Sequence, residues 1–185
     1  MQLFKITSAY RSKLIIGAYR KYIKANQIIL DVGCGNGLVS HELKKYFHIG
    51  VTGCDIISYL QYDIPFIKMK SKKILPFAGK TFDQVMFNDV LHHMEKTNQK
   101  IILQEALRIA NSVLIFEVIP TFKGKLFDYL MNKIHNPKMN LCFTFRTKDQ
   151  WEKVFRDLQV NYSVIEVPRP ILYPFSHIAF HLTKK

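Results

Sequence analysis

The stretch ILDVGCGNGLVS, residues 29–40, has glycines at alternate positions directly after an apolar run. Glycine has no Cβ and tolerates positive φ, so a turn of this kind lets a ligand approach the backbone closely. The dinucleotide fingerprint G-x-G-x-x-G needs its third glycine at position 38, where this chain has Leu38. Asp31, two residues before Gly33, would repel a pyrophosphate but attract a cationic group. The turn therefore predicts a ligand that is cationic rather than phosphorylated.

Further polar side chains follow the later apolar runs, namely Asp55, the pair Asn88 and Asp89, and Glu117. In an open parallel sheet, ligands bind outside the carboxyl ends of the strands, near the point where the strand order reverses. A lone aspartate at a strand end is usually only a turn former. Asp55, however, comes about 20 residues after the glycine turn, where other nucleotide sites have an acidic side chain that binds ribose hydroxyls. The sequence therefore predicts one ligand site at the ends of several strands.

The elements that would hold these groups alternate along the chain from residue 27 onward, which is typical of βαβ units and a parallel sheet covered on both faces. Strands are expected at 27–32, 49–54, 65–69, 82–88, 112–119, 160–167 and 177–183. Helices are expected at 9–24, 38–47, near Ser58, at 97–110, at 125–134, and from the capping box TKDQ at 147–150 through Leu158. The aromatic-rich stretch 120–146 departs from this rhythm and is interpreted as an insertion over the sheet.

The chain is strongly basic, with 27 lysine and arginine residues against 14 aspartate and glutamate residues and a net charge of +13. Such a charge would attract nucleic acid, an anionic membrane surface or an acidic substrate. Alternatively, it reflects a lysine-rich composition with no partner, because the charges are spread along the chain. No apolar run approaches the roughly 20 residues of a membrane span, and KLIIGAYRK is too short and too basic for a signal peptide. A cytoplasmic location is therefore expected.

The three cysteines, Cys34, Cys54 and Cys142, are too few and too scattered for a disulfide framework, and none forms a C-x-x-C pair. His177 and His181 share one face of the last expected strand but have no carboxylate or cysteine at a ligand spacing. No metal site is therefore expected.

Four segments resemble the class I S-adenosylmethionine-dependent methyltransferases, in particular the type 11-like domain: LDVGCGNG, GCDI, LPFAGKTFDQVMFNDVLHHM and VLIFEVIP. They stand in the family's order and at fitting spacings, between residue 28 and about residue 120. The resemblance implies an α/β fold, a Rossmann-like doubly wound sheet of seven strands that is mostly parallel with an antiparallel last strand and has helices on both faces. It also implies S-adenosyl-L-methionine as the cofactor.

On this basis the 185 residues are expected to form a single methyltransferase domain with four parts. These are an N-terminal helical cap (1–26), a cofactor-binding core (27–119), a lid-like insertion (120–146), and a C-terminal helix and strand pair (147–185). Specificity for the acceptor is expected to lie in the first helix, in the insertion and in the segment PRPILYPFSH, 168–177.

The resemblance also assigns roles to single residues. It implies that Asp31 favours the cationic amino group of the cofactor and that Asp55 binds the ribose hydroxyls. Ser71 stands where many relatives have an acidic residue that contacts the adenine amino group. Adenine recognition would then depend on the Ser71 hydroxyl, backbone groups and apolar side chains such as Ile56 and Leu75. The full set of expected cofactor-binding residues is Asp31, Gly33, Cys34, Gly35, Gly37, Asp55, Ile56, Ser71 and Asn88.

Methyl transfer from a sulfonium is an in-line displacement in which positioning contributes most, so a dedicated base is optional. If a hydroxyl acceptor must lose a proton, the candidate catalytic residues are His92, His93 and Asp89, together with Glu117. A histidine pair after the fourth strand is common in the family and is often structural.

The leading hypothesis for function is methyl transfer to a small organic or lipid-like acceptor. One alternative is an RNA methyltransferase, because GCGNG, GCD and the histidine pair also resemble tRNA wobble-uridine methyltransferases and the charge suits a phosphate backbone. Another is a noncatalytic cofactor-binding partner subunit. The chain reads NDVL after the fourth strand instead of an Asp/Asn-Pro-Pro-Tyr motif, which argues against methylation of DNA base amino groups.

Overall fold

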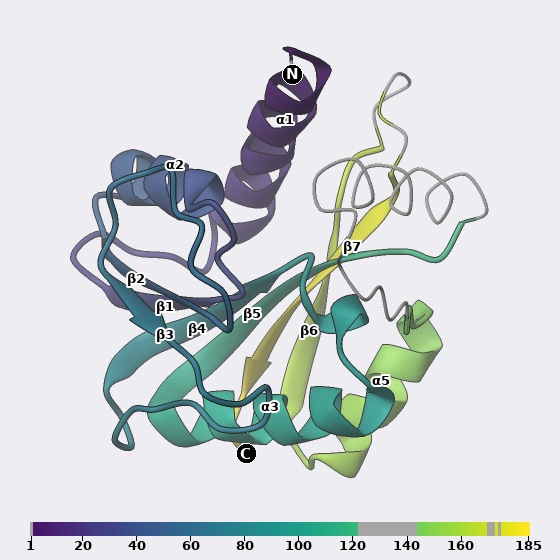
Figure 1. The fold of residues 1–185 in the computed structure, drawn as a ribbon. Coiled ribbons are helices and arrows are strands. Elements are labelled where there is room, and N and C mark those ends of the chain that lie inside the picture. The colour runs from purple at the N-terminus through teal and green to yellow at the C-terminus, as the bar shows by residue number, and fades with distance from the viewer. Residues whose placement is uncertain (1, 122–143, 170–172, 174) are drawn as a thin grey trace.

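A computed structural model describes residues 2–121, 144–169, 173 and 175–185, with residues 2–9 described by their backbone alone. Seven strands form one sheet in the order β3-β2-β1-β4-β5-β7-β6 (Figure 1). All neighbours pair in parallel except β7, which is antiparallel to both β5 and β6. This arrangement confirms the predicted fold class. The strands are β1 Ile28–Val32, β2 Gly50–Asp55, β3 Phe66–Lys68, β4 Phe82–Asn88, β5 Ala110–Val118, β6 Asn161–Glu166 and β7 His177–Thr183.

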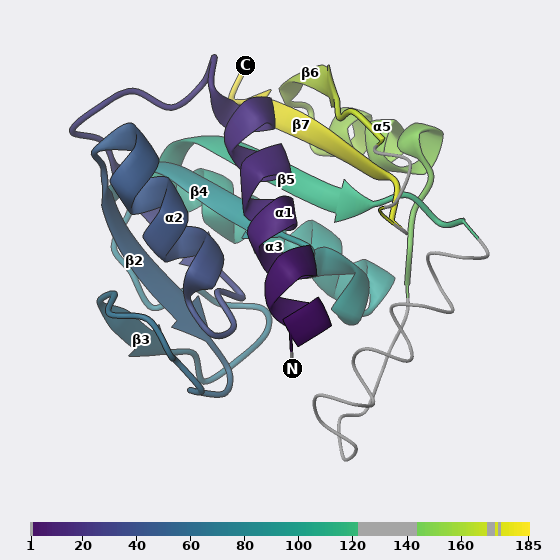
Figure 2. The same cartoon turned by 90° about the horizontal axis from the view of Figure 1, so that it is seen from above.

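Helices cover both faces of the sheet, as predicted (Figures 1 and 2). One face carries α1 Gln2–Tyr19 and α2 Leu38–Phe47, and the other carries α3 Lys96–Ile109 and α5 Lys148–Asp157. Successive side chains of β4 show how the sheet serves two cores, because neighbouring residues of a strand point to opposite faces. Met86 packs with the residues of α1 and α2, whereas Phe87 packs with those of α3 and α5.

The strand order reverses between β1 and β4, since β1 pairs with β2 on one side and with β4 on the other. The carboxyl ends of the central parallel strands therefore meet at one edge of the sheet, where ligands bind in folds of this kind. Because β7 is antiparallel, it begins at that same edge, with His177 opposite Val118. Polar residues from distant parts of the chain are thus brought together there.

Most expected elements agree with the structure to within two residues, and the capping box of α5 is confirmed by reciprocal hydrogen bonds between Thr147 and Gln150. The first helix ends earlier than expected, at Tyr19. Tyr22 and Ile23 continue the apolar spacing, but their amides bond to the Tyr19 carbonyl in a turn that brings Ile23 into the core.

The expected helix near Ser58 is wrong, because residues 56–60 form an irregular loop. The Gln61 amide donates to the Asn36 carbonyl at 2.9 Å, which fastens this loop to the glycine turn instead of to a helical turn. A short 3-10 helix, η1 Leu91–His93, was not expected. The expected helix at 125–134 and most of the lid-like insertion lie outside the described residues, as does Cys142. Among the helices that are described, none is long and apolar enough to cross a membrane.

Candidate active site

The glycine turn between β1 and α2 has positive φ at three positions, +75° at Gly33, +57° at Gly35 and +83° at Gly37. The three positions require glycine for different reasons. A Cβ on Gly33 would lie 2.2 Å from Val90 Cγ2, and one on Gly37 would lie 3.0 Å from Leu60 Cδ2. A Cβ on Gly35 would meet only the Tyr59 ring, at 3.9 Å. Gly33 and Gly37 are therefore needed for packing, and Gly35 is the position that leaves room for a ligand against the backbone.

Asp55, the last residue of β2, lies directly beside this open position. Its carboxylate accepts hydrogen bonds from the Gly35 amide at 3.2 Å and from the Ile56 amide at 2.7 Å. Burial raises the pKa of Asp55, while the amides and the more distant Lys72 act in the opposite direction. The side chain is only partly buried, so a half-exposed carboxylate and an open stretch of glycine backbone form one polar edge.

Asp31 lies deeper, with only 2% of its surface exposed. The Ser40 hydroxyl donates to one carboxylate oxygen, and the Asn88 amide donates to the other at 3.1 Å. Asn88 in turn accepts from the Tyr19 hydroxyl at 2.9 Å, so a buried chain of hydrogen bonds joins α1, β4, β1 and α2. Burial raises the pKa of Asp31 to about 6 against the lowering effect of Ser40 and Asn88. Sequence reasoning missed Tyr19 and Ser40, because neither belongs to a motif.

Three other expected cofactor residues surround this edge. Cys34 is buried, and burial raises the pKa of its thiol, so it packs as a neutral side chain against Gly53. Ile56 is half-buried on the core beneath the sheet edge. Ser71 accepts a hydrogen bond from the Lys73 amide at 3.1 Å and is half-buried in the loop after β3.

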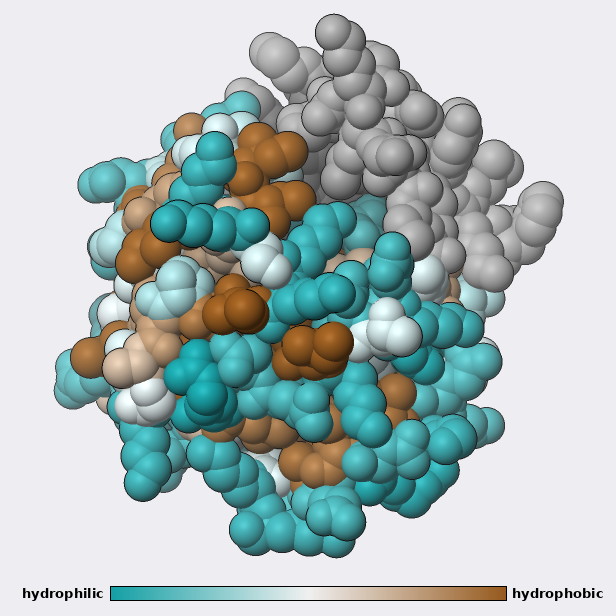
Figure 3. Space-filling view, turned by 60° about the horizontal axis from the view of Figure 1, so that its bottom comes forward, coloured by the Kyte–Doolittle hydropathy of each residue, from teal (hydrophilic) through white to brown (hydrophobic). Residues whose placement is uncertain are grey.

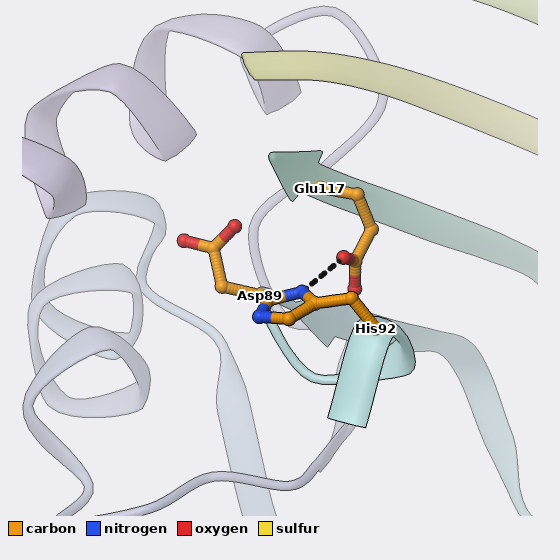
Figure 4. A group of neighbouring side chains, drawn as sticks. All are labelled: Asp89, His92 and Glu117. Atoms are coloured by element: carbon orange, nitrogen blue, oxygen red, sulfur yellow. Dashed lines mark hydrogen bonds and ion pairs between the residues drawn. The ribbon is translucent and has the colours of Figure 1, made fainter. Parts of the chain in front are cut away.

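Glu117 near the end of β5 holds the turn after β4 in place. One carboxylate oxygen accepts from the Val90 and Leu91 amides at 3.0 and 2.7 Å, and the other lies 2.6 Å from His92 Nδ1 (Figure 4). His92 and Glu117 are both buried, and the His92 ring stacks on Phe145. Glu117 and His92 therefore form a structural link between β5 and η1.

Asp89, His92 and Glu117 also offer three potential metal-ligand atoms within 4.8 Å of one another. Both Glu117 oxygens already accept hydrogen bonds, however, and the Asp89 carboxylate points away from Glu117 (Figure 4). A cation here would have to displace the bonds that hold η1, so the geometry favours a hydrogen-bonded cluster over a metal centre.

His93, the second histidine of the pair, is half-buried with its ring centroid 4.1 Å from that of His92. Burial and the neighbouring His92 lower the pKa of His93 to about 3. His93 is therefore neutral at physiological pH and is a weak base.

Asp89, directly after β4, has φ of +55° and directs its carboxylate toward β7 and α1. His177 Nε2 lies 3.2 Å from this carboxylate, and Arg11 Nη1 from α1 lies 3.5 Å away. Burial would raise the pKa of Asp89, but the charge and hydrogen bond of His177, together with Arg11, lower it to about 2. The other ring nitrogen of His177, Nδ1, is buried and has no hydrogen-bond partner in the part of the chain that the structure describes. The ring lies between Phe116 and Tyr173. The sequence presented His177 only as an unsupported metal ligand, because its partner is 88 residues away.

Comparison with known proteins agrees with this geometry. Residues 30–113 match a family model described as a methyltransferase domain. No curated protein matches the sequence significantly. Solved structures do match the fold. A cyclopropane-fatty-acyl-phospholipid synthase-like protein from Lactobacillus casei is 17% identical with a TM-score of 0.73, and the match covers 96% of this chain and 90% of that one.

Two further structures extend the comparison. A SAM-dependent methyltransferase from Methanosarcina mazei is 17% identical with a TM-score of 0.66, over 89% of this chain and 96% of that one. The 1,6-didemethyltoxoflavin-N1-methyltransferase of Burkholderia thailandensis, solved with S-adenosylhomocysteine, is 13% identical with a TM-score of 0.68, over 97% and 79% of the two chains. The seven-stranded sheet and these structures give this chain the fold of the class I S-adenosylmethionine-dependent methyltransferases, and residues 30–113 match the methyltransferase-domain family model.

Proposed function

We propose that the protein binds S-adenosyl-L-methionine at the edge formed by Gly35 and Asp55 and transfers its methyl group to a small organic or lipid-like acceptor. The observation that carries this proposal is the hydrogen bond of 3.2 Å between the Gly35 amide and the Asp55 carboxylate. It sets an acceptor for two hydroxyl groups beside the glycine of this turn whose missing Cβ leaves the most space. The structure with bound S-adenosylhomocysteine has the same fold and supports a cofactor of this chemistry.

The residues of this edge suit the parts of the cofactor. Asp55 is placed to accept hydrogen bonds from ribose hydroxyls. Ile57 and Tyr59, which follow it, are 53% and 42% exposed and offer an apolar surface for a purine ring. The buried negative charge of Asp31 favours the cationic amino group by its field, since both of its oxygens are already hydrogen-bonded within the protein.

The cofactor supplies a methyl group on a sulfonium, and the protein contributes mainly position. Where the acceptor is a hydroxyl, its proton needs an acceptor, and we propose Nδ1 of neutral His177 for this role, because Nε2–H donates to Asp89 and Nδ1 has no hydrogen-bond partner among the described residues. The acceptor oxygen would then form its bond to the methyl carbon as the carbon–sulfur bond breaks. His92 serves Glu117 and η1 as a structural residue, and His93 is a weaker base because of its low pKa.

An RNA acceptor is the second candidate, and the net charge of +13 is the observation that favours it. The noncatalytic partner subunit is the third. One pair of experiments separates them: calorimetry with S-adenosylmethionine, followed by incubation with metabolite, lipid and RNA extracts and cofactor labelled in its methyl group.

Label in a metabolite or lipid would support the proposal, and label in RNA would favour the second candidate. Cofactor binding without transfer to any extract would favour the partner subunit. Absence of cofactor binding would contradict the proposal as a whole.

A further inference from the structure

The end of β3 and the loop that follows it combine exposed aliphatic side chains with lysines. We call residues 67–74 the basic loop; they include the last two residues of β3 and read IKMKSKKI. Ile67 and Ile74, at its two ends, are 40% and 63% exposed. These two side chains place exposed aliphatic surface at both ends of one short segment.

The basic loop is fastened to the fold on both sides. The Met69 amide donates to the Asp55 carbonyl at 2.8 Å, and Met69 itself is buried. Beyond the loop, the Leu75 amide donates to Glu105 of α3 at 3.2 Å, and its carbonyl accepts from Arg108. Residues 70–74 therefore project between two fixed points.

Both isoleucines lie on the side of the sheet that carries α3. Ile67 pairs in register with Cys54, and Cys54 packs in the core beneath α3. Paired residues of neighbouring parallel strands point to the same face. Ile74 immediately precedes Leu75, whose backbone is bonded to α3. The space-filling view of the side that carries α3 shows separate hydrophobic patches among hydrophilic residues (Figure 3).

The lysines of the loop form no close ion pairs among the described residues. Lys68, Lys70, Lys72 and Lys73 are all exposed, and none of them forms an ion pair within the described part of the chain. The contrast with α5 is direct, since its cations pair with Glu152 and Asp157 one turn away. The basic loop thus presents lysines without close ion-pair partners beside two exposed isoleucines.

We propose that the basic loop docks on the surface of an anionic lipid bilayer. Isoleucine side chains enter the boundary between headgroups and acyl chains, and lysine ammonium groups bind anionic headgroups. Surfaces that bind single-stranded RNA add base stacking on aromatic rings or arginine to their phosphate contacts, and residues 67–74 contain neither residue type. The loop is bonded to the backbone of Asp55, so docking would bring the candidate active site to the membrane, where a lipid-like acceptor is found. This inference goes beyond the proposed function and holds without methyl transfer.

The test is cosedimentation of the full chain, without cofactor, with vesicles of phosphatidylcholine alone or of phosphatidylcholine and phosphatidylglycerol in equal parts. We expect binding only to the vesicles that contain phosphatidylglycerol. Each lysine at the surface contributes about fivefold to binding. The combined variant Lys70→Gln, Lys72→Gln and Lys73→Gln should therefore bind at least tenfold more weakly. The combined variant Ile67→Ser and Ile74→Ser should also bind more weakly, including at high salt, where charge effects are screened.

Matched controls lie away from the basic loop, on or beside α1 and α2 and at the amino end of β1. Lys21→Gln, Lys44→Gln and Lys45→Gln remove the same charge from exposed positions on or beside α1 and α2, and Ile28→Ser removes an isoleucine that is 54% exposed. Vesicle binding should change little in these variants. Equal weakening by both lysine triples would show that binding follows net charge and would overturn the proposal. It would also be overturned by binding to tRNA that depends on the loop lysines while no vesicle is bound.

Discussion

His177 Nε2 lies 3.2 Å from the carboxylate of Asp89, which joins the first residue of β7 to the residue directly after β4. The antiparallel direction of β7 makes this contact, because it starts the strand at the edge where the parallel strands end. Arg11 Nη1, from α1, lies 3.5 Å from the same carboxylate. Asp89 is therefore held by groups from two elements that pack against it from different sides.

Stability at low pH should depend on Asp89. Its pKa is lowered from 3.8 to about 2, so its contribution is present above 3.8 and is lost as the pH falls toward about 2. Linkage gives this contribution a size of about 2 kcal/mol. Chemical denaturation should show Asp89→Asn less stable than the natural protein at neutral pH, with the difference shrinking on acidification. Asp157→Asn, on the exposed pair with Lys153, should cost less than about 1 kcal/mol. A difference that does not vary with pH would contradict the ion-pair assignment.

Replacement of His177 tests its proposed role as proton acceptor. Once a hydroxyl acceptor is identified from the labelled extracts, His177→Gln should lower kcat by a factor of roughly 100, the scale of general-base catalysis. The dissociation constant for the cofactor should stay unchanged. His181→Gln is the matched control. His181 lies on the same strand but further from the candidate site, where its ring packs against Tyr22. An equal loss in both variants, or no loss in His177→Gln, would refute the role.

Asp55→Ala should weaken binding of S-adenosylmethionine by at least tenfold, because the hydrogen bonds to the ribose are lost together with the bond that holds the Gly35 amide. Calorimetry measures this, and circular dichroism should show an intact fold. Asp63→Ala changes an exposed aspartate in the neighbouring loop and should leave affinity unchanged. Normal affinity in the Asp55 variant would remove the basis for the proposed cofactor site.

Cofactor affinity should also vary with pH through Asp31. Its pKa is about 6, raised by burial, so the carboxylate gains a proton as the pH falls through this value. Protonation removes the negative charge that favours a cationic amino group, and affinity for S-adenosylmethionine should fall in the same range. In Asp31→Asn this dependence should disappear, with weak binding throughout. A steep dependence that persists in the variant would point to another group.

Much of the fold was predictable, because the spacing of apolar residues within each segment indicates whether it forms a strand or a helix, and polar residues mark where strands end. The expected strand at 82–88 and the helix at 38–47 coincide with β4 and α2. The loop near Ser58 was not predictable, because its path is set by hydrogen bonding to the distant glycine turn. The partners of His177 and Glu117 were equally hidden, since they depend on strand register and on direction in the sheet.

The glycine turn shows the same limit within a single motif. Sequence reasoning gave all of its glycines one role, close approach of the cofactor, and the structure distinguishes them by what a Cβ would touch. Gly33 faces the branched side chain of Val90, whereas Gly35 faces open space. The difference depends on the turn after β4, which lies more than 50 residues further along the chain.

Two alanine substitutions in this turn should therefore have opposite consequences. Gly33→Ala places a Cβ 2.2 Å from Val90 Cγ2 at a φ of +75°, and it should destabilise the protein by about 2 kcal/mol or more. Adding Val90→Ala should recover the steric part of this loss, although not the backbone part. Gly35→Ala, at a φ of +57° in open space, should cost only the backbone part of about 1 kcal/mol and should weaken cofactor binding instead. Denaturation measures the stability, and calorimetry the cofactor affinity, of the natural protein, Gly33→Ala, the double variant with Val90→Ala, and Gly35→Ala. If Val90→Ala gives no recovery, close packing is not the reason for glycine at position 33.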